Sequence, residues 1–496
     1  MVQYPYNNFY EILESNEKRF AKKPIIFLGK EKVTNQELKV KVDNLANYLD
    51  EQDISKGDKV AIILGNSTEF IISLFAITKL GAIAVPVNNF LKHEELGYII
   101  ENCQAKIVIS SSDYKDELLL IKDIKSDFLW IDTQDLSTKF NYNESSSNAT
   151  IDDLAVIIYT SGTTGNPKGA MLSYKNIFSN INGANEVFGF NQKDRFIVYL
   201  PMFHSFTLSI MVLLPLFNAS AIVIVTSIFP FSNVLKETLL KRVTVFLGVP
   251  TVYNALIKAK IPWYFMWFNK IRAFVSGSAP LSQKVLNDFK EKFPRATLLE
   301  GYGLSECSPA VSINKLEKQK ALSVGTPLPN YEVKIVDDEL LEVKTGDVGE
   351  IIVKGDCVMQ GYLNNQEATD STIKNGWLLS GDFGKVDEDG FIYIVDRKKD
   401  LIISKGINIY PREIEEVIMH YDGIEACAVI GEKDDNLDEK VVAYIEAKEN
   451  IKLDEKDIKK YLKEHLANFK LPKQIYIIDK LPRNATGKVL KRELKC

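Results

Sequence analysis

Apolar residues in the first half of the chain alternate between helical and strand spacing. Residues Gln36–Glu51 have apolar positions at helical spacing, and Phe70–Leu80 predicts a second helix that ends before a glycine. Short runs rich in β-branched residues at Lys59–Leu64, Ala82–Val87 and Val156–Tyr159 predict strands. Strands that alternate with helices in this way indicate an α/β fold, with parallel-rich sheets covered by helices on both faces.

One long stretch, Phe196–Leu235, contains no Asp, Glu, Lys or Arg. A membrane-spanning helix needs about 20 consecutive apolar residues. Pro201, Pro215 and Asn218 divide this stretch into shorter pieces. We therefore expect a buried helix followed by a buried strand at Ala221–Val225, and no membrane span.

The second half of the chain has a different pattern. From about Tyr331, short strands separated by Gly/Asp turns predict a small β-rich subdomain. A charge run, Asp396–Asp400, then precedes a separate α+β unit. Its predicted helices and strands are Pro411–His420, Ala426–Ile430, Val441–Ala447 and Asp454–Leu466. We therefore expect a large N-terminal domain at 1–396 and a small, mobile C-terminal domain at 397–496.

Length and charge narrow the class of protein. A single core stops growing at about 250–300 residues, so 496 residues indicate more than one domain. The net charge of −5 offers no basic surface, which makes nucleic acid an unexpected partner. Five scattered cysteines without a CxxC pair fit a reducing compartment, and the first residues lack a secretory pattern. We expect a cytoplasmic protein, at most peripheral to the inner face of a membrane.

The strongest local signal is the segment Tyr159–Gly169, which follows a predicted buried strand. Glycines allow tight backbone turns, and hydroxyls, amides and one lysine supply donors for a polyphosphate. The residues concerned are Thr160, Ser161, Gly162, Thr163, Thr164, Gly165 and Lys168. The segment is not a Walker A loop, because Lys168 is not followed by Ser or Thr. A flexible surface turn is the alternative.

Further motifs follow in a fixed order along the chain. They are Ser276–Leu281, Glu300–Glu306, Gly376–Asp382, Asp396–Asp400 and Pro482–Lys488. With the segment Tyr159–Gly169, which we call the phosphate loop, these motifs resemble those of the acyl-adenylate-forming (AMP-binding) superfamily. The resemblance extends over nearly the whole chain. Within that superfamily it looks most like bacterial long-chain fatty acyl-CoA synthetases.

The resemblance implies a nucleotide site. The loop and Lys168 would hold the β- and γ-phosphates of ATP, Glu306 would hold Mg²⁺, and Ser305 would donate to the α-phosphate. Tyr302 would stack on adenine and Asp382 would accept the ribose hydroxyls. The remaining residues of the implied site are Gly277, Ser278, Ala279, Glu300, Gly301, Gly303 and Arg397. Each of these residues also has an ordinary structural alternative. Glu306 would then be a solvated glutamate, Tyr302 a core tyrosine and Asp382 a turn aspartate.

The resemblance also implies catalytic and moving parts near the C-terminus. Lys488 would contact the carboxylate and the α-phosphate, where a positive charge stabilises the charge that builds up in the transition state. Lys399 falls at the hinge on which the family rotates its C-terminal domain. Ser404, Lys405 and Gly406 would approach the CoA channel. Without the surrounding motif, Lys488 would be an ordinary exposed lysine.

The sequence gives less information about which carboxylic acid the enzyme would activate. His204 stands where the family has an aromatic gate and is a candidate catalytic and pocket residue, although a core histidine is the alternative. No aspartate of the kind that amino-acid-activating members carry is present nearby. Phe206 and Ile210 would line an acyl pocket that suits an alkyl chain, and core packing explains them equally well.

From these motifs and residues we expect a fatty acid:CoA ligase of the AMP-forming kind, with Mg²⁺ as cofactor and ATP and CoA as co-substrates. An acyl-[carrier-protein] ligase and an aryl-acid CoA ligase stay open, since they share the adenylation residues. A non-catalytic acyl-adenylate binding protein would predict damage at Glu306 or Lys488, and both are present. A homodimer is left open.

Overall fold

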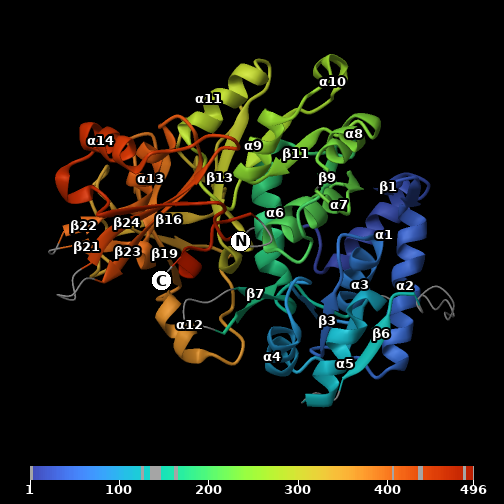
Figure 1. The fold of residues 1–496 in the computed structure, drawn as a ribbon. Coiled ribbons are helices and arrows are strands. Elements are labelled where there is room, and N and C mark those ends of the chain that lie inside the picture. The colour runs from blue at the N-terminus through green and yellow to red at the C-terminus, as the bar shows by residue number, and fades with distance from the viewer. Residues whose placement is uncertain are drawn as a thin grey trace.

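The computed structural model describes residues 4–124, 128–134, 147–160, 166–228, 230–404, 407–433, 439–483 and 487–494. The predicted Ser161–Gly165, Lys405 and Gly406 lie outside these ranges. Within them the chain forms helices and sheets of an α/β protein, followed by a smaller C-terminal unit (Figure 1). The predicted fold class is confirmed.

The first sheet has six strands in the order β6-β5-β3-β4-β7-β8. All neighbours are parallel except β7 and β8. The strands are β3 (Lys59–Ile63), β4 (Ile83–Pro86), β5 (Ile107–Ser110), β6 (Leu129–Asp132), β7 (Leu154–Thr160) and β8 (Lys168–Ser173). The helices before and between them are α1 (Phe9–Phe20), α2 (Asn35–Glu51), α3 (Thr68–Lys79), α4 (His93–Cys103), η1 (Ser112–Tyr114) and α5 (Lys115–Ile124).

Strand β3 explains why this sheet has helices on both faces. Val60 and Ile62 point into the main core, whereas Ala61 and Ile63 belong to a second apolar cluster with α4 and α5. Successive side chains of a strand point to opposite faces, so a continuous apolar run buries both. The predicted βαβ arrangement of this region is confirmed.

The second sheet has nine strands in the order β15-β14-β13-β12-β11-β9-β10-β1-β2. Its centre is parallel, and β2, β14 and β15 add antiparallel edges. The strands are β1 (Pro24–Leu28), β2 (Glu31–Thr34), β9 (Arg195–Val198), β10 (Ala221–Ile224), β11 (Val245–Gly248), β12 (Ala273–Ser276), β13 (Leu298–Gly303), β14 (Ala310–Ile313) and β15 (Thr326–Pro327). Its helices are α6 (Tyr174–Phe188), η3 (Thr207–Leu213), α7 (Leu214–Phe217), α8 (Ser232–Leu240), α9 (Pro250–Lys258), α10 (Trp263–Phe268), α11 (Gln283–Lys292) and η4 (Ser305–Cys307).

The charge-free stretch is divided as expected. It contains the buried π-helix η3, the short α7 and the buried strand β10. In the described part of the chain, no helix is both long and apolar enough to cross a membrane.

A third, antiparallel sheet forms the predicted β-rich subdomain. It contains β16 (Glu332–Val336), β17 (Gly349–Lys354), β18 (Ile373–Lys374), β19 (Trp377–Val386) and β20 (Ile392–Arg397), with α12 (Gln366–Thr372). Strand β20 ends at Arg397, and η5 (Lys398–Asp400) follows directly. The boundary predicted between residues 396 and 397 therefore lies at the end of a strand.

The C-terminal unit has its own core. It contains β21 (Ile402–Ser404), β22 (Ile407–Ile409), α13 (Pro411–Met419), β23 (Ile424–Lys433), β24 (Glu439–Ala447), α14 (Glu455–His465), η6 (Asn468–Lys470), β25 (Gln474–Ile478) and η7 (Lys491–Leu494). Ile414, Ile418, Ile458 and Leu462 pack against β23 and β24 in an apolar cluster separate from the main core. Figure 1 shows this unit on one side of the molecule, beside β13, β16 and β19.

Candidate active site

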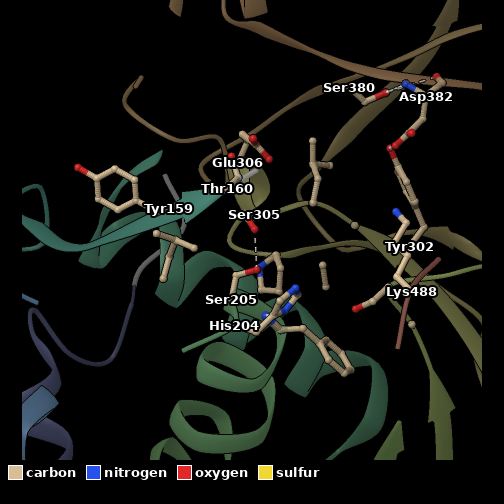
Figure 2. Close-up of a pocket in the computed structure, with 18 of the residues that line it drawn as sticks. Tyr159, Thr160, His204, Ser205, Tyr302, Ser305, Glu306, Ser380, Asp382 and Lys488 are labelled. Carbon is tan, nitrogen blue, oxygen red and sulfur yellow. Dashed lines mark hydrogen bonds between the residues drawn. The ribbon is translucent and has the colours of Figure 1, made fainter. Parts of the chain in front are cut away.

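A cavity of 1240 Å³ lies at the carboxyl ends of strands β7, β12 and β13, where open α/β sheets usually bind ligands. Its lining comes from both sheets of the large domain, from β19 and β20, and from the C-terminal unit. Figure 2 shows Tyr302, Asp382 and Lys488 on one side, Glu306 and Thr160 on the other, and His204 and Ser205 below them. Residues far apart in the sequence therefore meet around one space.

Glu306 is held by a tyrosine that the sequence motifs did not single out. The Tyr362 hydroxyl donates to Glu306 Oε1 at 2.9 Å, and Lys168 Nζ lies 5.3 Å from the centre of the same ring. All three residues line the cavity, together with Thr160. A carboxylate, an ammonium group and a hydroxyl thus gather beside the end of β7.

A second polar group lies around Asp382. The Tyr302 hydroxyl donates to Asp382 Oδ2 at 2.6 Å (Figure 2). Arg397 Nε lies 3.4 Å from Asp382 Oδ1. Burial raises the pKa of Tyr302 far above its ordinary value, so its hydroxyl keeps the proton that it donates. Ser380 Oγ fixes the turn by accepting from Asp382 N at 3.1 Å.

The Ser276–Leu281 turn lies beside this group. Gly277 and Ser278 line the cavity, and Ala279 lines a small adjacent space next to Lys488. A Cβ on Gly277 would lie 3.7 Å from Gly301 O and from the Phe206 ring, so the backbone passes close to both. Ser278 has a φ of 66°, a left-handed conformation that non-glycine residues adopt infrequently.

Glu300 is placed behind the cavity and not on its wall. Its Oε1 accepts from Leu281 N at 3.0 Å, and Oε2 has no hydrogen-bond partner among the described residues. Burial raises the pKa of this carboxyl to about 7. Gly301 and Gly303 do line the cavity, and a Cβ on Gly303 would collide with Pro309 O at 1.9 Å.

His204 and Ser205 lie at the bottom of the site in Figure 2, and Ser305 lies above Ser205. Ser205 Oγ and Ser305 Oγ share a hydrogen bond of 2.9 Å, and His204 Nδ1 accepts from Phe206 N at 3.4 Å. Burial, together with the nearby Lys488, lowers the pKa of His204 to about 4. The imidazole is therefore neutral at pH 7.

Lys488 reaches the cavity from the C-terminal unit. Gly487 precedes it with a φ of 83°, and a Cβ there would lie 2.8 Å from Thr251 Oγ1. Glycine is required at this close approach between α9 and the lysine-bearing segment. Burial and the neighbouring Arg397 lower the pKa of Lys488 to about 8.

Other cations lie near this lysine. Arg397, Lys399 and Arg492 also line the cavity, and Arg492 was not predicted from the sequence. Burial, with Arg397 nearby, lowers the pKa of Lys399. Ser404, at the end of β21, does not line the cavity.

Part of the wall is apolar. The cavity has an apolar region that comes from α6, η3 and neighbouring strands: Ala184, Phe188, Phe190, Phe206, Ile210, Leu214, Leu247, Val275 and Leu328. All of these side chains are hydrocarbon, so within the described residues this region offers no charge to a ligand. The predicted Phe206 and Ile210 are both in it.

Comparisons with known proteins agree with this arrangement. The AMP-binding enzyme model matches residues 13–363, and the AMP-binding enzyme C-terminal domain model matches residues 413–488. The chain is 31% identical to a long-chain-fatty-acid–CoA ligase of Escherichia coli and 32% identical to one of Bacillus subtilis, with 99% of this chain and 94% of each relative covered. A feruloyl-CoA synthase of Amycolatopsis is 33% identical over 93% of both chains.

Solved structures give the same picture. ATP-bound MatB from Rhodopseudomonas palustris superposes with a TM-score of 0.92 at 31% identity, covering 99% of this chain and 98% of that one. Apo MatB gives 0.79 with the same coverage and identity, so the present arrangement is nearer to the ATP-bound one. The o-succinylbenzoate CoA synthetase (MenE) of Bacillus subtilis with ATP and magnesium gives 0.89 at 29% identity, covering 99% of both chains. The chain therefore belongs to the AMP-binding enzyme family, among the acyl- and aryl-adenylate-forming CoA ligases.

Proposed function

We propose that this enzyme is a fatty acid:CoA ligase that uses medium- to long-chain acids. In the first step a carboxylate oxygen attacks the α-phosphorus of ATP, which gives acyl-AMP and releases pyrophosphate. In the second step the CoA thiol attacks the acyl carbon, loses its proton, and releases AMP. The observation that carries the choice of acid is the apolar region of the cavity, defined above.

The size of the hydrophobic effect supports this choice. Each buried CH₂ contributes about 0.8 kcal/mol, so an apolar wall selects for alkyl length without polar contacts. A second carboxylate, such as o-succinylbenzoate carries, would have no cation to pair with in the apolar region. The two long-chain-fatty-acid–CoA ligases that match over 99% of the chain support the same reading.

Residues on the polar side of the cavity would carry out adenylation. Lys168, Arg397 and Lys488 reduce the repulsion between a carboxylate and a triphosphate. Lys488, placed by Gly487, stabilises the negative charge that grows as the carboxylate attacks. Asp382 accepts the ribose hydroxyls, which then replace its present contacts with Tyr302 and Arg397.

Glu306 suits a magnesium ion bound together with ATP. Tyr362 occupies one carboxylate oxygen and leaves the other for a cation. Mg²⁺ is usually held by one or two carboxylates plus phosphate oxygens and water, so a single glutamate is sufficient. The ion would neutralise the leaving pyrophosphate.

An aryl-acid CoA ligase is the second candidate. The feruloyl-CoA synthase relative favours it, as do the three phenylalanines of the apolar region, Phe188, Phe190 and Phe206, whose rings supply aromatic contact area for an aromatic acid. An acyl-[carrier-protein] ligase differs only in the acceptor.

One assay separates these functions. Purified protein with ATP and Mg²⁺ is offered octanoate, dodecanoate, hexadecanoate, ferulate and anthranilate, each with CoA or with holo-acyl carrier protein. AMP and thioester are measured together. We expect the highest kcat/KM with an alkyl acid of at least eight carbons and CoA. Preference for an aryl acid, or turnover only with the carrier protein, would replace the proposed function by one of the other two.

A further inference from the structure

Helix α10 exposes aromatic side chains. Trp263 is 72% exposed, Trp267 69%, Phe268 62% and Tyr264 44%. We call these four residues the aromatic patch. Phe265, in the same helix, is 3% exposed and fixes the helix to the body of the protein. Figure 1 shows α10 projecting at the margin of the molecule, beyond α9. Apolar surface gathered in this way commonly marks an interaction site.

The surroundings of the aromatic patch are basic, although the whole chain is acidic. Between Glu237 and Asp288 the sequence contains no Asp or Glu, while it carries Lys241, Arg242, Lys258, Lys260, Lys270, Arg272 and Lys284. Two of these are matched by acids from other elements, since Lys258 pairs with Glu425 and Arg272 with Asp194.

Lys260 and Lys270, on either side of α10, are exposed and form no ion pair within the described residues. Arg295 adds a guanidinium 5.5 Å from the centre of the Trp267 ring. The aromatic patch is therefore bordered by positive charges that form no ion pair with an acid of the described residues.

Tryptophan and tyrosine beside lysine are typical of side chains at a membrane–water interface. Their rings combine an apolar body with a polar N–H or O–H, and lysines at the edge reach lipid phosphates. A short helix of this kind lies in the plane of the headgroups, where anionic lipids attract its cations.

The segment that carries α10 is connected to the apolar region of the cavity. Arg272, four residues after α10, donates to Phe188 O at 3.2 Å and to Gly189 O at 3.5 Å. Its guanidinium also lies 5.0 Å from the centre of the Phe190 ring. Phe188 and Phe190 both line the cavity.

We propose that the aromatic patch docks the enzyme on a bilayer that contains anionic phospholipid. Docking places the apolar region of the cavity near the lipid surface into which fatty acids partition. This use of the surface rests on the proposed function, whereas docking itself is independent of which acid is activated.

Vesicle binding tests the proposal with the full-length protein and no substrate. The probes are vesicles of phosphatidylcholine alone and of phosphatidylcholine with phosphatidylglycerol at a ratio of 4:1. The variants are Trp263→Ser/Trp267→Ser and Lys260→Glu/Lys270→Glu. The control is Leu341→Ser, which removes a side chain that is 65% exposed in the β-rich subdomain. Co-sedimentation and the blue shift of tryptophan fluorescence are measured.

We expect binding to the anionic vesicles that weakens at least tenfold in each double variant and is unchanged in Leu341→Ser. ATP–pyrophosphate exchange with octanoate, a soluble acid, should stay at the wild-type rate in every variant, which shows that they fold. No binding to anionic vesicles, or binding that both double variants retain, would overturn the proposal. Self-association that depends on Trp263 and Trp267, without vesicle binding, would assign the surface to a second copy instead.

Discussion

Glu300 and Lys488 are ionisable residues that the fold removes from water, and in both cases burial favours the neutral form. The pKa of Glu300 rises to about 7 and that of Lys488 falls to about 8. Their surroundings differ, because Lys488 lines the cavity whereas Glu300 lies behind the Ser276–Leu281 turn. We therefore assign Glu300 to positioning that turn and Lys488 to chemistry.

The shifted pKa of Glu300 predicts how stability depends on pH. The carboxyl has an ordinary pKa of 4.5, so between pH 4.5 and 7 the folded state binds a proton that the unfolded state has lost. The free energy of unfolding therefore decreases as pH rises through this window. Glu300→Gln keeps an acceptor for Leu281 N and cannot ionise. It should be more stable than the wild type at pH 8 by roughly 1–3 kcal/mol, and by much less at pH 5.

Thermal unfolding at the two pH values provides the measurement. The matched control is Glu291→Gln, which changes an exposed glutamate of α11. If Glu300→Gln raised the free energy of unfolding equally at pH 5 and pH 8, ionisation of Glu300 would not be the cause of the increase.

Lys488 should affect the two half-reactions unequally. Lys488→Ala removes the charge that faces the attacking carboxylate, so pyrophosphate release should fall by about 10²–10³-fold. Thioester formation from supplied acyl-AMP should stay near the wild-type rate. Lys463→Ala, which changes an exposed lysine of α14, is the control. If both half-reactions slowed equally, the lysine would have a structural role.

The sequence motifs predicted most of the residues that line the cavity, but they did not predict the contacts between their side chains. Glu306 lies in a motif, whereas Tyr362, which holds it, is 56 residues away and in no motif. Glu300 and Glu306 stand in the same motif, yet only Glu306 reaches the cavity. The side chain of Glu300 is directed at the Ser276–Leu281 turn, where it accepts from Leu281 N, whereas Glu306 follows the end of β13 and contacts Tyr362.

At the scale of elements, periodicity located the regular segments well. Predicted and observed bounds differ by no more than two residues for α2, α3, β3 and β4. The apolar positions of α2 follow the helical period, whereas the short apolar runs of α3, β3 and β4 are bounded by polar residues or glycine. A buried helix was predicted where η3 lies, but its bounds and its π-helical form were not. All seven of its residues are buried, so no polar face reports the helical repeat.

A substitution in helix α6 should change which chain length of acid the enzyme prefers. Ala184 and Phe188 lie one turn apart on it, and both line the apolar region. Ala184→Leu should fill part of the space. Because each excluded CH₂ loses about 0.8 kcal/mol, the ratio of kcat/KM for hexadecanoate to that for decanoate should fall by about tenfold or more.

Competition between the two acids in one reaction measures this ratio directly. Ala467→Leu, at an exposed alanine of the C-terminal unit, should leave it unchanged. An unaltered ratio in Ala184→Leu would place the alkyl chain elsewhere in the cavity.

At the scale of the whole molecule, two parts of the chain form the wall of the cavity. The large domain supplies most of the wall, and the chain that follows β20 adds Lys398, Lys399, Lys488, Leu490 and Arg492. Lys258 of α9 and Glu425 of β23 form an ion pair across the two parts. We propose, as the family resemblance implies, that this arrangement serves adenylation and that the C-terminal unit turns at Lys399 before the thiol reacts.

Linking the two parts should separate the half-reactions. Lys258→Cys/Glu425→Cys, joined by a short bifunctional thiol reagent, would hold the present arrangement. Pyrophosphate release in a single turnover should persist, while thioester formation should fall at least tenfold. The same variant without the reagent is the control, and full thioester formation after linking would exclude the rotation.

The position of Lys488 on a segment pinned by Gly487 against Thr251 has a consequence for the intermediate. An acyl-phosphate anhydride is easily hydrolysed, and Lys488, which we propose helps to form it, also lines the cavity that would hold it. We propose that Lys488 limits the access of water to the anhydride while the C-terminal unit keeps this arrangement. Without an acceptor thiol, the enzyme should therefore retain its acyl-AMP after one cycle, and hydrolysis of ATP without thioester formation would be limited by how often the C-terminal unit moves away.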